Sequence, residues 1–143
     1  MLTFSITGAQ IKDFMQHLFT HDTFIEFEVR GVVLHTFVNF EITGNCLWQD
    51  LRPYIRFVIK GREKPRAMKI IFARVNPDQL HPNAAALFIN IIYNVSSEGE
   101  QDKITCTTAT SQKEFALDRT LDREWDDWVI EFFKKIGITP ELG

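Results

Sequence analysis

The sequence lacks the features that mark membrane-spanning, secreted and disulfide-rich proteins. No run of about eighteen apolar residues occurs, and no basic, apolar and small-residue signal stands at the N-terminus, so we expect a cytoplasmic protein without membrane contact. The only two cysteines, Cys46 and Cys106, lie far apart and form no CxxC pair. This argues against a disulfide framework or a zinc knuckle, and we expect both thiols to be buried or half-buried.

Phosphate-binding loops and metal-ligand clusters are missing as well. Gly61 is the one glycine near the basic residues, and it follows an expected helix instead of opening one, which argues against the common nucleotide-binding folds. His17 and His21 have helical spacing with Asp22 beside them, but no glutamate follows His17 as in a metalloprotease. We predict surface histidines near a helix C-terminus, no metal site and no other cofactor.

Candidate nucleophiles and acid–base pairs lack their partners. Residues 103–111 are rich in threonine, which is common in strands and needs an adjacent base to become a nucleophile. The carboxylate pairs Asp126–Asp127 and Asp122–Glu124 point in different directions on a helix and do not share one site. We therefore predict no catalytic residue and a protein that is not an enzyme. A small enzyme whose site is assembled from residues distant in sequence stays the alternative.

Length and composition fit one soluble globular domain. The chain has 143 residues, long enough to bury a core of its own, so we expect a single domain over residues 1–143. A hydrophobic fraction of 45% and a charged fraction of 24% argue against a disordered chain. The formal net charge is -3, but the charges are unevenly distributed.

Basic residues concentrate in the stretch 47–75. Eight of the sixteen lysines and arginines lie here, and between Arg52 and Arg74 only Glu63 opposes them, which gives a local charge of +7 (eight minus one). The eight are Arg52, Arg56, Lys60, Arg62, Lys64, Arg66, Lys69 and Arg74. In order, the stretch predicts a helix, a basic turn and a buried strand.

The predicted helix of this stretch has an apolar and a basic stripe. Arg52, Arg56 and Lys60, spaced i, i+4 and i+8, form the basic stripe beside an apolar one that would pack against a sheet. The apolar residues are Trp48, Leu51, Ile55, Val58 and Ile59. We expect the helix to begin near Asp50, which would cap it and leave Pro53 in the first turn.

The N-terminal part of the chain predicts a strand, a helix and a hairpin. The expected strands cover residues 2–6, 24–30 and 32–42. Thr7 and Gln10 make a capping box that opens the helix, and Gly31 stands at the join of the two later strands. Residues 44–45 mark a turn before the basic stretch.

The C-terminal part predicts further strands and a closing helix. The expected strands cover residues 67–75, 87–95, 103–111 and 114–117. The last helix carries a broad apolar arc from Leu121 to Ile136 and ends at Gly137. Its other face is acidic, because seven carboxylates stand against two arginines between Glu114 and Glu131.

Four aromatic residues of the last helix allow two interpretations. They are Trp125, Trp128, Phe132 and Phe133. Their spacing is more typical of a core than of an interface. Phe133 lies at the edge of the arc, however, and if it is exposed the helix offers a surface for a protein partner or for self-association.

The predicted elements give an α+β fold, an antiparallel sheet with helices packed on it and a C-terminal helix. A helix followed by hairpins occurs twice, in LTFSITGAQIKDFMQHL with FIEFEVRGVVLHTF and in the basic helix with MKIIFA and LFINIIY. This pattern resembles one domain of the DNA sliding clamps over residues 1–117. The resemblance implies two βα-plus-hairpin units whose helices present lysine and arginine to duplex phosphates.

Three further segments carry a second resemblance. LRPYIRFVIKG, CTTATSQKEFALD and LDREWDDWVIEFFKK look similar to a family of short, uncharacterised bacterial proteins, found mostly in anaerobic Gram-positive species. The resemblance spans most of the chain and implies no activity.

The charge pattern favours a non-catalytic binding module. We predict that Arg52, Arg56 and Lys60 contact a polyanion such as duplex DNA without reading its sequence. Arg62, Lys64 and Arg66 would help them. Two alternatives stay open: a protein–protein adaptor acting through the acidic, aromatic last helix, and a basic surface that pairs with an acidic protein instead of a nucleic acid.

Overall fold

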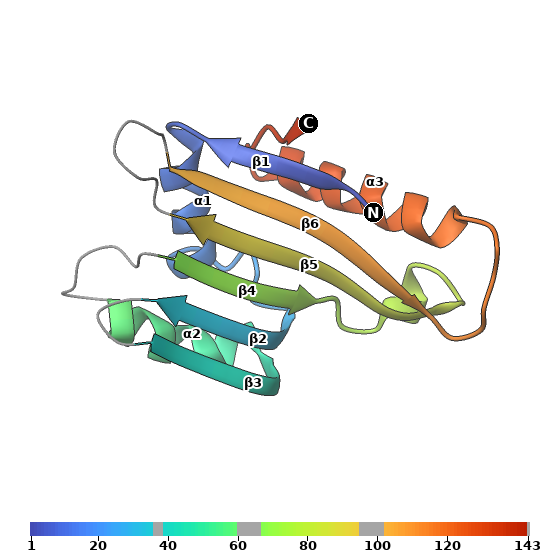
Figure 1. Ribbon diagram of the computed structural model, residues 1–143, viewed down its shortest axis with the longest axis horizontal. Coiled ribbons are helices and arrows are strands. Elements are labelled where there is room, and N and C mark those ends of the chain that lie inside the picture. Colours follow the sequence, from blue (N-terminus) through green and yellow to red (C-terminus); the bar gives the residue numbers. More distant parts are fainter. Residues whose placement is uncertain (36–38, 60–66, 95–101, 143) are drawn as a thin grey trace.

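A computed structural model describes residues 1–35, 39–59, 67–94 and 102–142. Within these ranges a seven-stranded antiparallel sheet carries three α-helices, which confirms the predicted α+β class (Figure 1). Gly61, which follows the expected basic helix, and the residues from 95 to 101 lie outside the described residues.

Every pair of neighbouring strands in the sheet is antiparallel. The strands are β1 (Thr3–Thr7), β2 (Glu28–His35), β3 (Asn39–Leu47), β4 (Ala67–Ala73), β5 (Ala84–Asn94), β6 (Lys103–Gln112) and β7 (Glu141–Leu142). Their order across the sheet is β3-β2-β4-β5-β6-β1-β7. The first strand is therefore inserted between β6 and the last strand, where Thr3 pairs with Thr107 and Phe4 with Leu142.

The helices lie together on one face of the sheet (Figure 1). They are α1 (Gln10–Phe19), α2 (Trp48–Ile59) and α3 (Thr120–Lys135), with a short 3-10 helix η1 (Pro77–Gln79) between β4 and β5. Phe14 of α1 stacks on Phe133 of α3 with 5.7 Å between ring centroids. Trp48 of α2 lies edge-on to Phe72 of β4 at 5.3 Å, so aromatic rings join the helices to one another and to the sheet.

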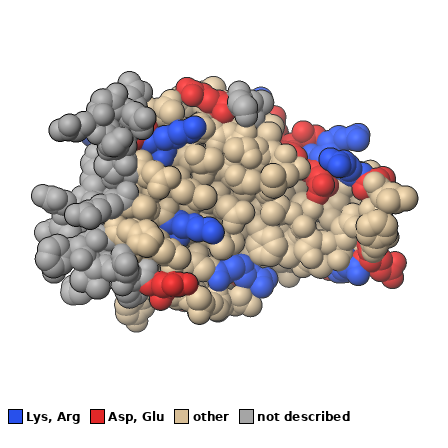
Figure 2. All heavy atoms as spheres, in the orientation of Figure 1, with Lys and Arg blue, Asp and Glu red and all other residues tan. Residues whose placement is uncertain are grey.

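The strands alternate between a buried and an open face. In β4, Met68, Ile70 and Phe72 are buried against the helices, whereas Lys69 is exposed and Ile71 is half-buried on the other side. None of the helices in the described ranges covers this second face. Figure 2, which has the orientation of Figure 1, shows that most of the visible face carries no charge and that its lysines and arginines are scattered.

Three predicted features of the hairpin region are wrong. The strand expected at 24–30 begins only at Glu28, because Phe24 and Phe27 turn into the core three residues apart, and Phe24 stacks on Phe72 at 4.9 Å. Gly31 is not a join but lies inside β2, next to a bulge. Likewise the turn predicted at 44–45 is strand, since β3 runs on to Leu47.

Helix α2 begins one half-turn earlier than predicted, at Trp48 instead of near Asp50. The buried Trp48 fixes this start, because its backbone N–H donates to the carbonyl of Phe27 at 2.9 Å. Pro53 therefore lies inside the helix. Because proline has no N–H, the carbonyl of Gln49 has no helical hydrogen-bond donor. Pro53 and Gln49 are both exposed, so water can donate to that carbonyl instead.

Residues 114–117 form no strand, contrary to the prediction. Side-chain amides hold this segment as a loop, with Asn83 exchanging two hydrogen bonds with the backbone of Glu114 and Gln112 exchanging two with Ala116. The predicted capping box is also wrong, because α1 begins at Gln10 without a side-chain cap. The Oε1 atom of Gln10 accepts a hydrogen bond from the Thr139 N–H instead, at 2.7 Å.

Candidate functional site

Helix α2 has the buried stripe that its spacing predicted. Trp48 and Ile55 are fully buried and Leu51 is nearly so. The indole N–H of Trp48 donates to the carbonyl of Leu18 at 2.9 Å, which fixes the rotation of α2 against α1. The side chains of residues 57–59 lie outside the description, so the stripe is established for its first two turns.

Arg52 of the predicted basic row is engaged within the protein. Its Nη1 donates to the carbonyl of His21 at 2.6 Å, and its Nη2 pairs with the Asp22 carboxylate at 3.2 Å. The Arg52 side chain is only 16% exposed, whereas that of Asp22 is 75% exposed. Arg52 thus ties α2 to the segment after α1, and its charge is partly neutralised before any external anion approaches.

Three exposed cations lie toward one end of the sheet, with Arg56 on the helix side and Lys69 on the open face. Arg56 stands in the last turn of α2, which leads toward the start of β4, and Lys69 follows in β4 itself. Lys103 opens β6 at the same end, because Ala67 pairs with Asn94 and Asn94 with Lys103. Figure 1 shows the end of α2 and the beginnings of β4 and β6 together at that end. We call Arg56, Lys69 and Lys103 the basic end.

The remaining predicted phosphate contacts are Lys60, Arg62, Lys64 and Arg66, which lie outside the described residues. The sequence connects them directly to both Arg56 and β4. Sequence reasoning missed Lys103 as a neighbour of this group, because only the register of β5 with β6 places it there. The β-like run at 87–95 followed by a turn and a second strand was the available signal.

The histidines at the end of α1 have neighbours that account for them. The rings of His17 and His21 meet edge-on at 5.0 Å between centroids, and Nδ1 of His17 shares a hydrogen bond of 2.7 Å with the Thr23 hydroxyl. Asp22, the proposed carboxylate companion, pairs with Arg52. Across the described residues no three side chains of histidine, cysteine, aspartate or glutamate cluster as metal ligands would.

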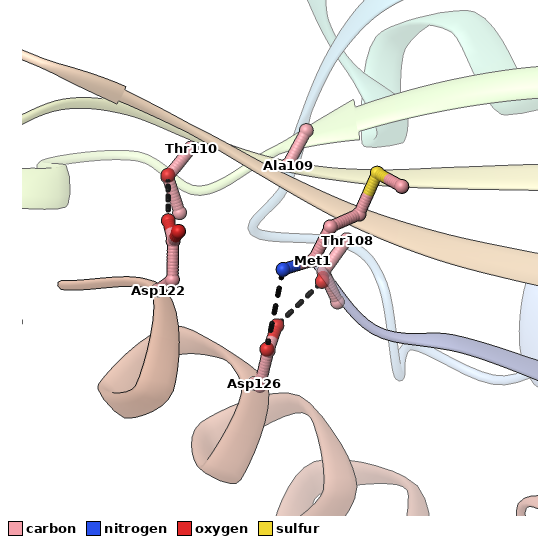
Figure 3. A pocket seen from close by; sticks show the side chains of 6 residues that line it. All are labelled: Met1, Thr108, Ala109, Thr110, Asp122 and Asp126. Atoms are coloured by element: carbon pink, nitrogen blue, oxygen red, sulfur yellow. Dashed lines mark hydrogen bonds and ion pairs between the residues drawn. The ribbon is translucent and has the colours of Figure 1, made fainter. Parts of the chain in front are cut away.

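A Thr–Asp cluster joins α3 to β6. Thr108 and Thr110 point from alternate positions of β6 toward Asp126 and Asp122, one helical turn apart on α3 (Figure 3). Each threonine hydroxyl donates to the aspartate facing it, and the Met1 ammonium group lies 3.8 Å from Asp126. Together with Ala109, these residues line a hollow of about 220 Å³.

The cluster is a structural contact with little catalytic potential. Thr108 is the one buried polar residue of the described core, and its hydroxyl oxygen also accepts from the Leu2 N–H at 2.8 Å, so donor and acceptor capacities are both used. Sequence reasoning considered only carboxylates one or two positions apart. The i, i+4 spacing of Asp122 and Asp126, facing threonines two apart in a strand, was the signal for this contact.

The aromatic residues of α3 belong mainly to the core. Trp125 and Phe133 are fully buried, as the core interpretation predicts, and the alternative in which Phe133 is exposed at the edge of the arc is wrong. Trp128 and Phe132 are half-buried and stack on one another at 5.2 Å, and Trp128 stacks on Trp125 at 5.1 Å. Burial of its two deepest rings weakens the case for α3 as a surface for partners or self-association.

Both cysteines are free, as predicted, with Cys106 buried and Cys46 half-buried. Burial raises the pKa of the Cys106 thiol far above its ordinary value. Burial, and then the negative charge of Asp50, raise the pKa of Cys46 as well. Neither thiol is thus activated as a thiolate nucleophile.

One protein family matches the chain. Its model covers residues 45–141, and it is described as a family of unknown function (DUF5721). No curated protein and no solved structure matches the chain, so the resemblance to a sliding-clamp domain stays a prediction. None of the described helices is long and apolar enough to span a lipid bilayer.

Proposed function

The chain belongs to the DUF5721 family, and because that family has no known function we propose a role from charge and geometry: a non-catalytic binding module whose basic end contacts a polyanion such as duplex DNA. The observation that supports it is the position of Arg56, Lys69 and Lys103. These exposed cations come from α2, β4 and β6, yet they lie at one end of the sheet.

The sequence between α2 and β4 strengthens this end. Four more cations, Lys60, Arg62, Lys64 and Arg66, and a single carboxylate, Glu63, occupy positions 60–66. Arg52 is left out of the contact set, because it pairs with Asp22. The carboxylates of α3 belong to a different element, so a chain with a net charge of -3 can still attract phosphates at its basic end.

Such a contact would be electrostatic and independent of base sequence. Lysine and arginine neutralise phosphates and release condensed counterions, so the logarithm of the affinity falls with the logarithm of salt by about 0.9 per duplex phosphate contacted. Three contacts from the basic end would contribute a slope of about 2.7 by the same relation.

The test is binding to a fluorescent duplex of random sequence at about 50 mM and about 200 mM salt, a range over which phosphate contacts weaken strongly. The variant Arg56→Gln, Lys69→Gln, Lys103→Gln removes three charges from the basic end. Its matched control is Lys113→Gln, Arg119→Gln, Arg123→Gln, which removes three exposed charges from the loop after β6 and the start of α3.

We expect the native protein and the control to bind with steep salt dependence. The basic-end variant should bind at least tenfold more weakly at low salt and with a shallower salt slope. No binding by the native protein at low salt would end the nucleic-acid proposal. Equal losses in the variant and the control would show that net charge, and not the basic end, governs binding.

A further inference from the structure

A second site lies on the helix side of the sheet, away from the basic end. The segment before β2, the junction of β3 with α2, the segment from β4 to η1 and the middle of α3 meet around a pocket of about 470 Å³, a size that suits a small organic molecule. Its lining includes Arg74, Trp128, Glu26, Gln49, Asn76 and Gln79.

Arg74 has a guanidinium group without a full set of partners. The group lies over the Trp128 ring, with its central carbon 5.0 Å from the ring centroid. Its Nη1 atom is enclosed and meets no hydrogen-bond acceptor among the described residues. Within the same residues Arg74 takes part in no ion pair. A buried donor of a charged group without an acceptor is costly, so it calls for an explanation.

The aromatic side of the pocket is rigid. Trp128 is the middle ring of a stack in which Trp125 lies at 5.1 Å and Phe132 at 5.2 Å. Phe27, which also lines the pocket, meets Trp128 edge-on at 6.2 Å. Because the fully buried Trp125 anchors this stack, Trp128 holds the Arg74 guanidinium in one place.

The rest of the lining combines apolar surface with uncharged polar groups. Ile25, Leu47 and Val75 are apolar, whereas Gln49, Asn76 and Gln79 offer amides. Glu26 is the one carboxylate of the lining, and it makes no ion pair with Arg74 among the described contacts. Mostly apolar walls with a few polar groups and one cation are typical of a site for an organic anion.

We propose that this pocket binds a small organic carboxylate with an apolar body, whose carboxylate pairs with Arg74. Guanidinium binds a carboxylate through two parallel hydrogen bonds, which would give the Arg74 donors their acceptors. The single cation and the nearby Glu26 favour a monoanion, because a phosphate dianion would meet more repulsion. The proposal is independent of polyanion binding, since Arg74 follows the end of β4 opposite to the basic end.

The test uses isothermal titration with benzoate, and with benzamide as a neutral ligand of the same shape. Phenyl phosphate and inorganic phosphate test the other sources of an oxyanion. Arg74→Gln removes the charge at the pocket, and Arg56→Gln removes an exposed charge at the basic end as the matched control. Far-ultraviolet circular dichroism checks that each variant is folded.

We expect saturable binding of benzoate by the native protein and by Arg56→Gln, and at least tenfold weaker binding of benzamide. Arg74→Gln should lose at least tenfold in benzoate affinity. If Arg74→Gln does not fold, Glu26→Gln supplies the second test, because loss of the like charge should tighten benzoate binding.

Three results would overturn the proposal. The first is the absence of saturable benzoate binding to the native protein. The second is equal affinity for benzoate and benzamide, or no loss in Arg74→Gln. The third is tighter binding of phenyl phosphate or inorganic phosphate than of benzoate, which would assign the pocket to phosphate.

Discussion

Replacement of Phe133 by alanine tests whether α3 is part of the core. Phe133 is fully buried and meets Phe4 of β1 edge-on at 4.9 Å and Phe14 of α1 in a stacked pair at 5.7 Å. One ring therefore joins α3 to two elements near the start of the chain. Phe133→Ala should remove both contacts and leave a cavity that the surrounding sheet and helices fill only in part.

The expected loss follows from this environment. Truncation of a buried phenylalanine to alanine costs about 3–5 kcal/mol, which includes transfer of the ring and the cavity. Loss of favourable ring pairs places Phe133 at or above the middle of that range, at about 4 kcal/mol. A domain of this size has a free energy of unfolding of about 5–15 kcal/mol, so the variant should stay folded but lose much of its stability.

Urea unfolding followed by tryptophan fluorescence and circular dichroism measures the change. The matched control is Phe115→Ala, which removes the same ring from a loop position that is 85% exposed and should change stability by less than about 0.5 kcal/mol. A loss below about 1 kcal/mol for Phe133→Ala would refute the reasoning, because removal of a buried ring should lower the free energy of unfolding by more than that.

Two further predictions concern titratable groups. Burial, together with the hydrogen bond of 3.0 Å to Asp102, raises the pKa of Tyr93 to about 12. In a Tyr54→Phe variant, Tyr93 is the one remaining phenol, and ultraviolet absorbance should show it ionising near pH 12. The free energy of unfolding should fall as the pH rises from about 10 to about 12, because the unfolded chain releases this proton first. Ionisation near pH 10 in the folded protein would contradict this. For the thiols, we expect an aromatic disulfide reagent to modify Cys46 in the native protein and Cys106 only in urea; modification of native Cys46→Ser at the same rate would show that Cys106 is accessible.

The fold class was predictable because several elements carry strong local signals. The strand β5 has the densest β-branched and aromatic run of the chain, and α3 combines a broad apolar arc with Gly137, whose φ of +83° suits a helix end. The predicted element boundaries were wrong where tertiary contacts override the local hydrophobic pattern. Phe27 and Val29 alternate with charged residues as in a strand, yet Phe24 and Phe27 both enter the core from the segment before β2.

The candidate sites were less predictable, because they depend on pairs distant in sequence. From the sequence alone Arg52 is predicted to be a surface charge. Only the fold shows that Asp22, thirty residues earlier, lies beside it. Arg74 is likewise predicted to be one more member of the basic stretch, whereas the fold places its guanidinium group over Trp128. Local spacing predicts which face of a helix a residue occupies, but not which residue of another element will meet it.

The insertion of β1 between β6 and β7 has a consequence for the order of folding. Thr3 can pair with Thr107 only when the ends of a segment of about a hundred residues come together. Closing so long a loop costs about 4 kcal/mol of chain entropy. The meander from β4 to β6 closes much shorter loops and can therefore form earlier. During synthesis the first strand to leave the ribosome must wait, unpaired, for one of the last.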